Sequence, residues 1–327
     1  MIQKWYNPFI ISLYIVFLMV TLRGTFITLT ANSWWIGWLG MEINLLGFII
    51  LILNKNRNES ALKYFVVQSL GSVILISRAL TTENFSLKSL QLLLSLAIFL
   101  KLGIAPLHYW IILMVESFNK FQIIILLTWQ KLAPLYLLFS LPPNKVIYGF
   151  IIMSLVIGAF CSLNELRIYI LITYSSINHT GWLLLTALSN ELIRLLYVII
   201  YTIIITTVIT PLSNKQTQSL WLLNNQVKYI VFMNLLSLAG LPPFSGFIIK
   251  WILLSEIYFF TNIIINMVLI LTRIVLLYFY LRLRLNTFLR NKLNLQRFKP
   301  LRYSNLILVR ILNVPLICLI IIFVSSI

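Results

Sequence analysis

The sequence has few charged residues and two cysteines, and it contains no aspartate. Charged side chains make up 10% of the 327 residues, and all seven acidic residues are glutamate. Cys161 and Cys318 both lie in apolar segments, so neither a disulfide framework nor a cysteine metal cluster is expected. Walker loops, dinucleotide-binding glycine patterns and Ser-His-Asp arrangements are also missing from the sequence. We therefore expect no nucleotide, flavin, iron–sulfur or metal site in this chain.

Apolar residues, by contrast, are abundant. They form 61% of the chain, and the mean hydropathy is +0.98, whereas soluble domains are about 45–50% apolar. A membrane-spanning helix needs about 20 residues, so eleven of them would leave only short loops. We predict an all-α polytopic membrane protein in which residues 1–327 form a single membrane domain in the lipid bilayer. The formal net charge of +18 then lies in loops on one membrane face and does not indicate a nucleic-acid partner.

Eleven spans are predicted from the apolar runs. They cover residues 8–29, 33–53, 60–80, 88–105, 121–140, 145–163, 167–188, 192–211, 228–253, 258–281 and 304–325. The segment 106–118 is expected to continue the fourth span as a separate half-helix. The first apolar run is too long for a signal-peptide core, so we expect the chain to be inserted without a cleaved targeting segment.

Positive charge is distributed unequally between the two sides of these spans. Loops on the amino-terminal side hold fourteen lysines and arginines, seven of them in residues 282–302, and loops on the other side hold four. The positive-inside rule then places the amino terminus on the inner face, which is the cytoplasm or the mitochondrial matrix. It places the carboxyl terminus on the outer face.

Glycine and proline interrupt the fourth and ninth spans, and a lysine accompanies each interruption. The first interruption runs from Lys101 through Gly103 to Pro106, and the second runs from Gly240 to Lys250. Paired broken helices in corresponding positions of two halves indicate a binding site or ion path in membrane transporters. The two interruptions therefore favour a proton or ion translocator.

The positions of the two breaks also predict an internal repeat. Each broken span is the fourth of a group of five, in repeat one at about 8–140 and repeat two at about 145–281, with a final helix at about 304–325. Five is odd, so the second group would enter the membrane from the opposite side, as in an inverted-topology repeat. The alternative is two unrelated proline kinks, because membrane helices tolerate proline and glycine without any transport role.

Four charged residues fall inside the predicted spans. Glu42 lies near the middle of the second span, Lys101 is well inside the fourth, Lys131 is central in the fifth, and Lys250 follows the second break. A charge at the centre of a bilayer costs roughly 2.5–3.5 kcal/mol on insertion scales. A permanent ion pair would explain Glu42 and one lysine. Three lysines against one glutamate instead favour a path on which buried lysines take up and release protons.

Three further residues have weaker signals. His179 lies among hydroxyl and amide side chains in the seventh span, where it can relay protons, although a lone buried histidine is more often a satisfied core residue. Lys63, at the start of the third span, either joins the path or extends to the membrane interface. Arg273 lies within a span, and because arginine keeps its proton we assign it a structural role.

Six motifs occur in order over residues 33–251. They are Met41–Leu46, Glu59–Phe65, Lys101–Trp110, Leu127–Pro134, Ser175–Trp182 and Phe232–Phe244. On these motifs the chain resembles the subunit 2 family of the mitochondrial respiratory NADH:ubiquinone oxidoreductase (complex I), in an invertebrate-like form.

The resemblance implies an antiporter-like fold in the membrane arm of that complex, related to a fourteen-helix bacterial form with three helices missing. It also implies that Glu42, Lys101, Lys131 and Lys250 form a hydrophilic axis that couples electron transfer from NADH to ubiquinone to proton pumping. NADH, FMN, iron–sulfur clusters and ubiquinone are expected in partner subunits, with other membrane-arm subunits as partners. The expected location is the mitochondrial inner membrane, with the amino terminus in the matrix and the carboxyl terminus in the intermembrane space.

Two other functions are compatible with the same residues. A subunit of a multisubunit cation/proton antiporter would share the fold without redox chemistry, and it would have only membrane chains as partners. An inert scaffold subunit would hold its buried charges as permanent ion pairs. That second alternative predicts that proton pumping survives the substitution Lys101→Ala.

Overall fold

The structure is a computed structural model that describes residues 8–53, 58–80, 87–142, 145–212, 225–242, 244–258 and 263–292. Helices form all the regular elements in these ranges. The chain divides into two compact units, Met1–Val146 and Ile147–Ile327. The predicted final span, 304–325, lies outside the described residues.

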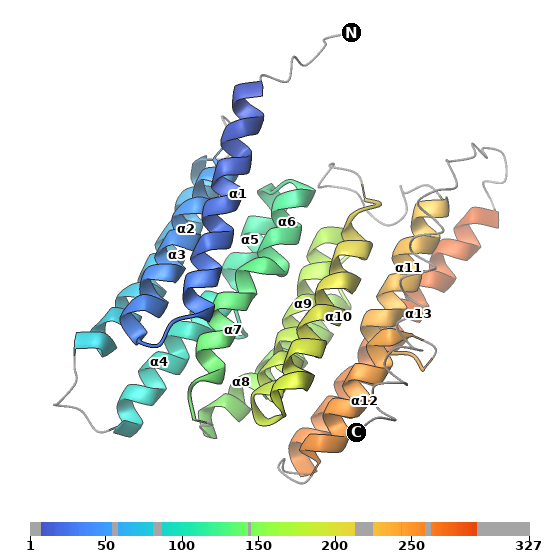
Figure 1. Ribbon diagram of the computed structural model, residues 1–327. Helices are drawn as coiled ribbons and strands as arrows, with labels where there is room; N and C mark the ends of the chain where they lie inside the picture. The colour runs from blue at the N-terminus through green and yellow to red at the C-terminus, as the bar shows by residue number, and fades with distance from the viewer. Residues whose placement is uncertain are drawn as a thin grey trace. The chain divides into compact units, whose positions relative to one another are not determined.

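Unit 1 consists of helices that follow the predicted spans closely (Figure 1). They are α1 (Pro8–Leu29), α2 (Trp34–Ile52), α3 (Asn58–Leu80), α4 (Leu87–Leu102), α5 (Tyr109–Ser117), α6 (Lys120–Leu127), the 3-10 turn η1 (Trp129–Lys131) and α7 (Leu132–Phe139). One difference lies in the predicted span 121–140, where the structure places a 3-10 turn between two shorter helices. Pro134 explains this turn, because it lacks the N–H group that would bond to the carbonyl of Gln130 in a continuous helix.

Unit 2 is likewise helical in its described residues. Its elements are α8 (Lys145–Ser162), α9 (Ile168–Leu185), the 3-10 turn η2 (Thr186–Leu188), α10 (Glu191–Ile209), α11 (Asn225–Ala239), α12 (Ser245–Ile257) and α13 (Ile263–Lys292). The helices α11 and α12 have 15 and 13 residues. Each is shorter than the roughly 20 residues that a span requires, so together they form the predicted broken ninth span.

Several helical segments have the length and composition of membrane spans. Within the described ranges six segments qualify, namely Ser12–Leu29, Trp34–Ile52, Glu59–Ser77, Lys120–Phe139, Glu191–Ile209 and Ile263–Leu283. This confirms the prediction of an all-helical, multi-pass membrane protein. The predicted total of eleven spans extends beyond the residues that the structure describes.

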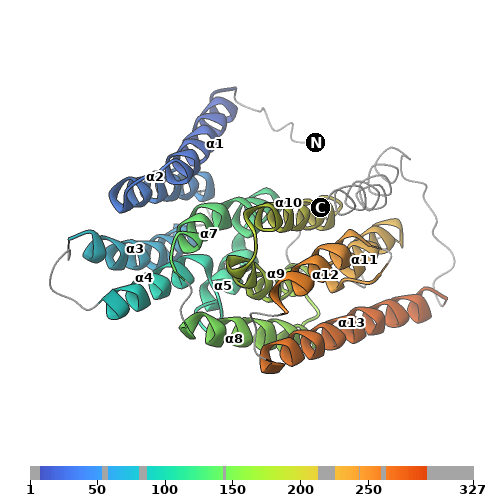
Figure 2. The same ribbon diagram turned by 60° about the horizontal axis from the view of Figure 1, so that its bottom comes forward.

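In unit 1, α1 and α2 lie side by side because small residues line their contact (Figures 1 and 2). A methyl group added to Gly24 would lie 2.5 Å from the backbone nitrogen of Asn44, and one added to Gly47 would lie 2.8 Å from the side chain of Thr21. Small residues allow such close backbone approach, which is how membrane helices pack without a hydrophobic driving force. This contact fixes the position of α2, the helix that carries Glu42.

In unit 2, α8 and α9 form the same kind of contact. A methyl group added to Gly158 would lie 2.6 Å from the backbone nitrogen of Asn178, and one added to Gly181 would lie 2.5 Å from the Ser154 hydroxyl. Gly158, Asn178 and Gly181 each follow their counterparts Gly24, Asn44 and Gly47 by 134 residues. The first two helices of each unit therefore share a packing pattern at a constant spacing along the chain.

Candidate functional site

The first helix break is a glycine-based turn at the end of α4. Gly103 has a φ of +63°, a conformation that favours glycine. The Gly103 amide donates to the carbonyl of Leu100 at 3.2 Å, and the Ile104 amide donates to the carbonyl of Phe99 at 3.1 Å. These two bonds define a Schellman motif. The turn therefore ends α4 one residue after Lys101, as the glycine and proline in the sequence predict.

Two neutral side chains donate hydrogen bonds to carbonyl groups at this break. The Gln68 amide on α3 donates to the Lys101 carbonyl at 3.2 Å, and the Trp110 indole on α5 donates to the Leu100 carbonyl at 3.2 Å. The side chain of Lys101 is therefore not needed to stabilise the turn. It lies instead against Gly71, where an added methyl group would be 2.8 Å from the Lys101 Cγ atom.

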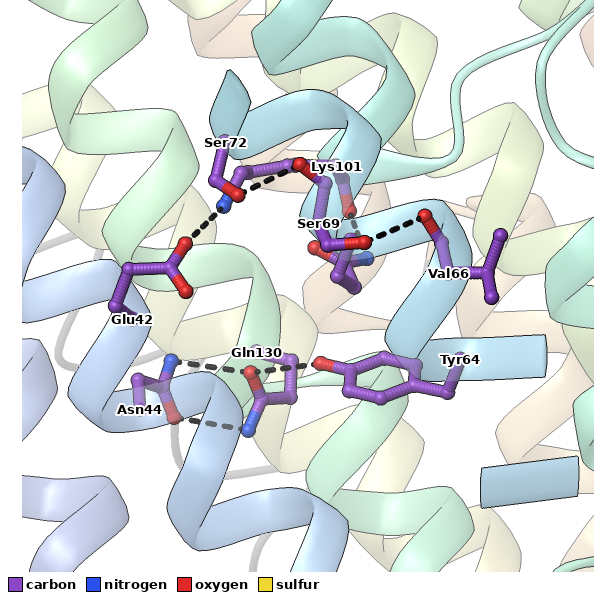
Figure 3. A network of polar contacts seen from close by, with 9 residues as sticks. Glu42, Asn44, Tyr64, Val66, Ser69, Ser72, Lys101 and Gln130 are labelled. Carbon is purple, nitrogen blue, oxygen red and sulfur yellow. Dashed lines mark hydrogen bonds and ion pairs between the residues drawn. The ribbon is translucent and has the colours of Figure 1, made fainter. Parts of the chain in front are cut away.

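Lys101 and Glu42 form an ion pair across α4 and α2. The Lys101 Nζ atom lies 3.7 Å from the Glu42 Oε1 atom, and the two side chains are 2% and 23% exposed. The two groups point toward one another in Figure 3. Their separation is longer than a direct hydrogen bond, so the contact is an electrostatic one between the two charges.

Lys131 occupies the 3-10 turn η1, between α6 and α7. The residue is 4% exposed. Its neighbour Gln130 forms two reciprocal hydrogen bonds with Asn44 on α2, both of 3.0 Å, and accepts a third from the Tyr64 hydroxyl at 3.4 Å (Figure 3). The amide pair thus ties the turn that carries Lys131 to α2, two residues from Glu42.

A small cavity connects the two lysines of unit 1. It offers about 20 Å³ to the centres of water molecules, and about 10–15 Å³ is enough for one. Its polar lining consists of Asn44, Tyr64, Gln68, Lys101, Gln130 and Lys131. Lys101 and Lys131 therefore face a common space in which water, amides and a phenol can carry hydrogen bonds between them.

The second helix break is another Schellman motif, at the end of α11. Gly240 has a φ of +84°. Its amide donates to the carbonyl of Ser237 at 3.1 Å, and the Leu241 amide donates to the carbonyl of Leu236 at 3.3 Å. The structure therefore contains one turn of this kind in each unit, at the two positions that the sequence predicts.

Cationic side chains satisfy the free carbonyls at this second break. The Lys250 Nζ atom donates to the Leu238 carbonyl at 2.7 Å, and the Arg273 guanidinium donates to the Gly240 carbonyl. Lys250 is 1% exposed, and its Nζ atom lies 5.3 Å from the centre of the Trp182 ring. Lys250 is thus completely enclosed within unit 2, on the α12 side of the break.

His179 and Lys63, the two weaker candidates for the proton path, lie in different surroundings. The His179 Nδ1 atom is 3.0 Å from the Tyr197 hydroxyl, in the buried core of unit 2. Lys63 forms an ion pair with Glu59 one turn away on α3, and its side chain is 49% exposed. Lys63 is therefore not among the residues that line the cavity.

Sequence reasoning assigned no role to the groups that hold the lysines in place. These are Asn44, Tyr64, Gln68 and Gln130 in unit 1 and Trp182 in unit 2. Arg273, to which the sequence assigned a structural role, also bonds at the second break. Asn44 and Gln130 did carry a signal, because each is an amide inside a predicted span, next or nearly next to a charged residue. Among the described residues no cluster of three or more His, Cys, Asp or Glu side chains could hold a metal ion.

Comparisons of sequence identify relatives along most of the chain. A family model described as NADH:quinone oxidoreductase/Mrp antiporter, transmembrane, matches residues 31–276. The NADH-ubiquinone oxidoreductase chain 2 of Anopheles gambiae is 36% identical over 297 residues, covering 84% of this chain and 86% of that protein. The protein of the same name from Ovis aries is 34% identical, covering 86% of each chain.

Solved structures share the fold at lower identity. A chain of respiratory complex I from Thermus thermophilus with bound aureothin has a TM-score of 0.73 at 20% identity, covering 84% of this chain and 70% of that chain. A chain of the Mrp complex from Dietzia sp. DQ12-45-1b has a TM-score of 0.71 at 17% identity, covering 81% of this chain and 58% of that chain. Both likenesses concern the fold, which is the antiporter-like membrane fold.

Proposed function

This chain belongs to the NADH-ubiquinone oxidoreductase chain 2 family, within the NADH:quinone oxidoreductase/Mrp antiporter group, and from this we propose its function. It is a proton-translocating subunit in the membrane arm of the respiratory NADH:ubiquinone oxidoreductase. It couples electron transfer from NADH to ubiquinone to proton pumping. Its location is the mitochondrial inner membrane, where it is a multi-pass protein.

One observation carries the proton-pumping role at the level of residues. Lys101 and Lys131 line the same cavity, which is large enough for water. Both are 5% exposed or less, and burial disfavours the charged form of a lysine. Burial in a shared cavity suits both lysines to taking up and releasing protons, and the amides that line the cavity supply hydrogen-bonding positions between them.

The Glu42–Lys101 pair provides a control point for this movement. When the carboxylate is near, it stabilises the ammonium form of Lys101, and when the two groups separate, burial favours release of the proton. The cavity then offers Lys131 as the next acceptor. Quinone reduction in the complex would supply the energy that changes the separation.

In unit 2 the proton-carrying residue is Lys250. Its Nζ atom bonds to the free carbonyl of Leu238 at the helix break, which stabilises the ammonium form. His179 and Tyr197 add a second titratable contact in the same unit. Lys63 is left out of the path because its side chain is half exposed and pairs with Glu59.

The same proposal includes the finer architecture. The two units are repeats of five spans each, inverted in the membrane, followed by an eleventh span near residues 304–325. The shared Schellman turns and the constant spacing of 134 residues between the Gly24 and Gly158 contacts support the repeat. The distribution of lysine and arginine among the loops supports a matrix amino terminus and a carboxyl terminus in the intermembrane space.

Redox cofactors belong to other subunits in this proposal. NADH, FMN, the iron–sulfur clusters and ubiquinone bind there, and this chain takes part in the enzyme through its membrane-arm neighbours. Its remaining contacts are with lipid, which suits the large apolar side chains that α3 and α13 expose, such as Val73 and Ile263.

Native gel electrophoresis tests whether the chain is part of this complex. Inner membranes are solubilised gently, the complexes are separated, the gel is stained for NADH oxidation, and mass spectrometry locates the chain. We expect it in the stained band. If the chain migrates in a smaller assembly of membrane proteins without NADH oxidation, the respiratory assignment is wrong and the cation/proton antiporter function takes its place.

A further inference from the structure

Two cations share the carboxyl end of the broken helix α11. Lys250 donates to the Leu238 carbonyl from α12, and Arg273 donates to the Gly240 carbonyl from α13. Gly240 lies between them, since a methyl group added there would be 3.2 Å from the Arg273 Nη2 atom and 3.4 Å from the Lys250 Cδ atom. The carboxyl end of a helix carries partial negative charge, so both cations have a favourable position.

Arg273 also contacts the second half of the broken helix. Its guanidinium carbon lies 4.8 Å from the centre of the Phe247 ring, three residues before Lys250 on α12. A cation at that distance from an aromatic face is attracted to it. A single side chain from α13 therefore holds the end of α11 through a hydrogen bond and the start of α12 through a ring.

In the part of the chain that the structure describes, no carboxylate pairs with either of these two cations. Among the described residues of this unit, Arg167 forms an ion pair with Glu165. Neither Lys250 nor Arg273 takes part in an ion pair there. Glu256, on α12 itself, accepts hydrogen bonds from Asn190 at the far end of the helix. Glu191 lies exposed in the first turn of α10.

The remaining titratable or charged groups on the helices around Lys250 are neutral, distant or engaged elsewhere. They are Tyr169, Tyr174 and His179 on α9, Arg194, Tyr197 and Tyr201 on α10, Lys228 and Tyr229 on α11, Tyr258 after α12, and Tyr278, Tyr280, Arg282, Arg284, Arg290 and Lys292 on α13. The tyrosines are neutral near pH 7. His179 bonds to Tyr197, and Arg194 donates to the Ser189 carbonyl. Arg273 is thus the charged group that shares the helix end with Lys250.

We propose that Arg273 is a positioning residue for proton transfer, which fixes the two halves of the broken helix and supplies a permanent positive charge that promotes proton release from Lys250. The inference rests on the proposed proton-carrying role of Lys250. Arginine keeps its proton at any pH a protein meets. Of the two cations at this helix end, Lys250 is therefore the one that can release its proton. Repulsion from Arg273 opposes the attraction of the Leu238 carbonyl, so Lys250 can both take up and release a proton.

The test is the pH dependence of proton pumping by the intact complex in sealed vesicles. The neutral variant Arg273→Gln keeps hydrogen-bond donors but removes the charge. Without the repulsion Lys250 holds its proton more firmly, so the profile of protons pumped per electron should move to higher pH, by about one unit. Arg273→Lys keeps the charge and should leave the profile in place.

Two results would overturn the inference. One is an Arg273→Gln complex with the wild-type pH profile, and the other is an Arg273→Lys complex shifted as far as the neutral variant. If the Arg273→Gln complex does not assemble, the Arg273→Lys complex decides alone. A shifted pH profile in that complex contradicts a role that depends on charge, and an unshifted profile supports it. The parent function fails separately, through normal pumping by a Lys250→Met complex.

Discussion

The two helix breaks have the same backbone geometry but different chemistry. Both end a helix in a Schellman turn at a glycine with positive φ, Gly103 in unit 1 and Gly240 in unit 2. In each turn the carbonyl two residues before the glycine is free to accept a hydrogen bond. Gln68 fills that position in unit 1, and Lys250 fills it in unit 2.

The two lysines next to the breaks are therefore not equivalent. Lys101 precedes its glycine and faces Glu42, whereas Lys250 follows its glycine and faces a carbonyl and the Trp182 ring. A carboxylate can move away and change the stability of an ammonium group by a full charge, but a backbone carbonyl is fixed. We infer that the proton affinity of Lys101 is switched by its partner, while that of Lys250 is set by its fixed surroundings.

A second pair of equivalent residues shows the same contrast. Asn44 and Asn178 occupy matching positions against a glycine of the preceding helix. The Asn178 amide donates to the Leu155 carbonyl at 3.0 Å, within the contact of α8 and α9. The Asn44 amide is instead bonded to Gln130, beside Lys131. The same residue serves helix packing in unit 2 and the lysine-bearing turn in unit 1.

The largest difference should come from removing, one at a time, the two donors that bond to equivalent carbonyls, Lys250 in unit 2 and Gln68 in unit 1. Lys250→Met removes the group proposed to carry the proton, and loss of such a group typically costs about 10²-fold or more in rate. Gln68→Leu removes a structural donor, leaving a buried carbonyl unsatisfied at a cost of about 1–3 kcal/mol in stability. Coupled NADH:ubiquinone turnover in sealed vesicles should fall much less in the second variant than in the first. Equal losses in both would show that the two positions are alike.

The glycines of the two turns should differ in their tolerance of alanine. Positive φ costs alanine about 1–2 kcal/mol at either site. At Gly103 the methyl group would also collide with Ile111, whereas at Gly240 its nearest neighbour is the end of the flexible Arg273 side chain, 3.2 Å away. We expect Gly103→Ala to destabilise the complex by about 2–5 kcal/mol and Gly240→Ala by about 1–2 kcal/mol.

Thermal inactivation of the assembled complex measures this difference. Gly149→Ala is the matched control, because nothing lies within 4 Å of a methyl group at that position. It should be neutral or slightly stabilising in a helix. A lower inactivation temperature for Gly240→Ala than for Gly103→Ala would contradict the described packing of the two turns.

The amide pair of unit 1 should show energetic coupling of intermediate size. Asn44→Ala and Gln130→Ala remove partners of the same two hydrogen bonds, so a double-mutant cycle should give about 0.5–3 kcal/mol of interaction energy. Gln122 is the control, because its amide donates to the Leu51 carbonyl, seven residues after Asn44 on α2. The effects are measured by thermal inactivation of the assembled complex. If those of Asn44→Ala and Gln130→Ala are additive, the amide pair does not hold the turn.

The smallest effect should follow from changing the exposed ion pair on α3. Lys63→Met removes a charge that pairs with Glu59 at the surface and lies outside the cavity. Exposed pairs contribute little to stability. Proton pumping and complex abundance should both stay at wild-type levels. A clear loss of pumping would bring Lys63 into the path and weaken the distinction between exposed and cavity-lining lysines.

The backbone of this fold could largely be predicted from the sequence. The predicted span 8–29 matches α1, and both breaks occur at the expected glycines, because long apolar runs and the glycine-proline pattern are local signals. The turn at Lys131 was not predicted, although Pro134 lies within the next helix. A single proline inside an apolar run is equally compatible with a kinked helix.

The partners of the buried charges were harder to predict. Asn44 and Gln130 are 86 residues apart, and Gly240 and Arg273 are 33 residues apart. Each pairing depends on which faces of distant helices meet, and periodicity does not determine this where all faces are apolar. The sequence indicated which residues carry charge in the membrane, but only the packing shows that Lys101 faces a carboxylate and Lys250 a carbonyl.

The most direct test of the account is proton pumping by an assembled complex that carries Lys101→Arg. Arginine can keep the ion pair with Glu42, but it does not release its proton. Assembly is checked on a native gel, and the number of protons pumped per electron is then measured in sealed vesicles. The account predicts normal assembly with a reduced proton-to-electron ratio. A wild-type ratio would contradict it, because the buried pair would then be structural and the lysine would carry no proton.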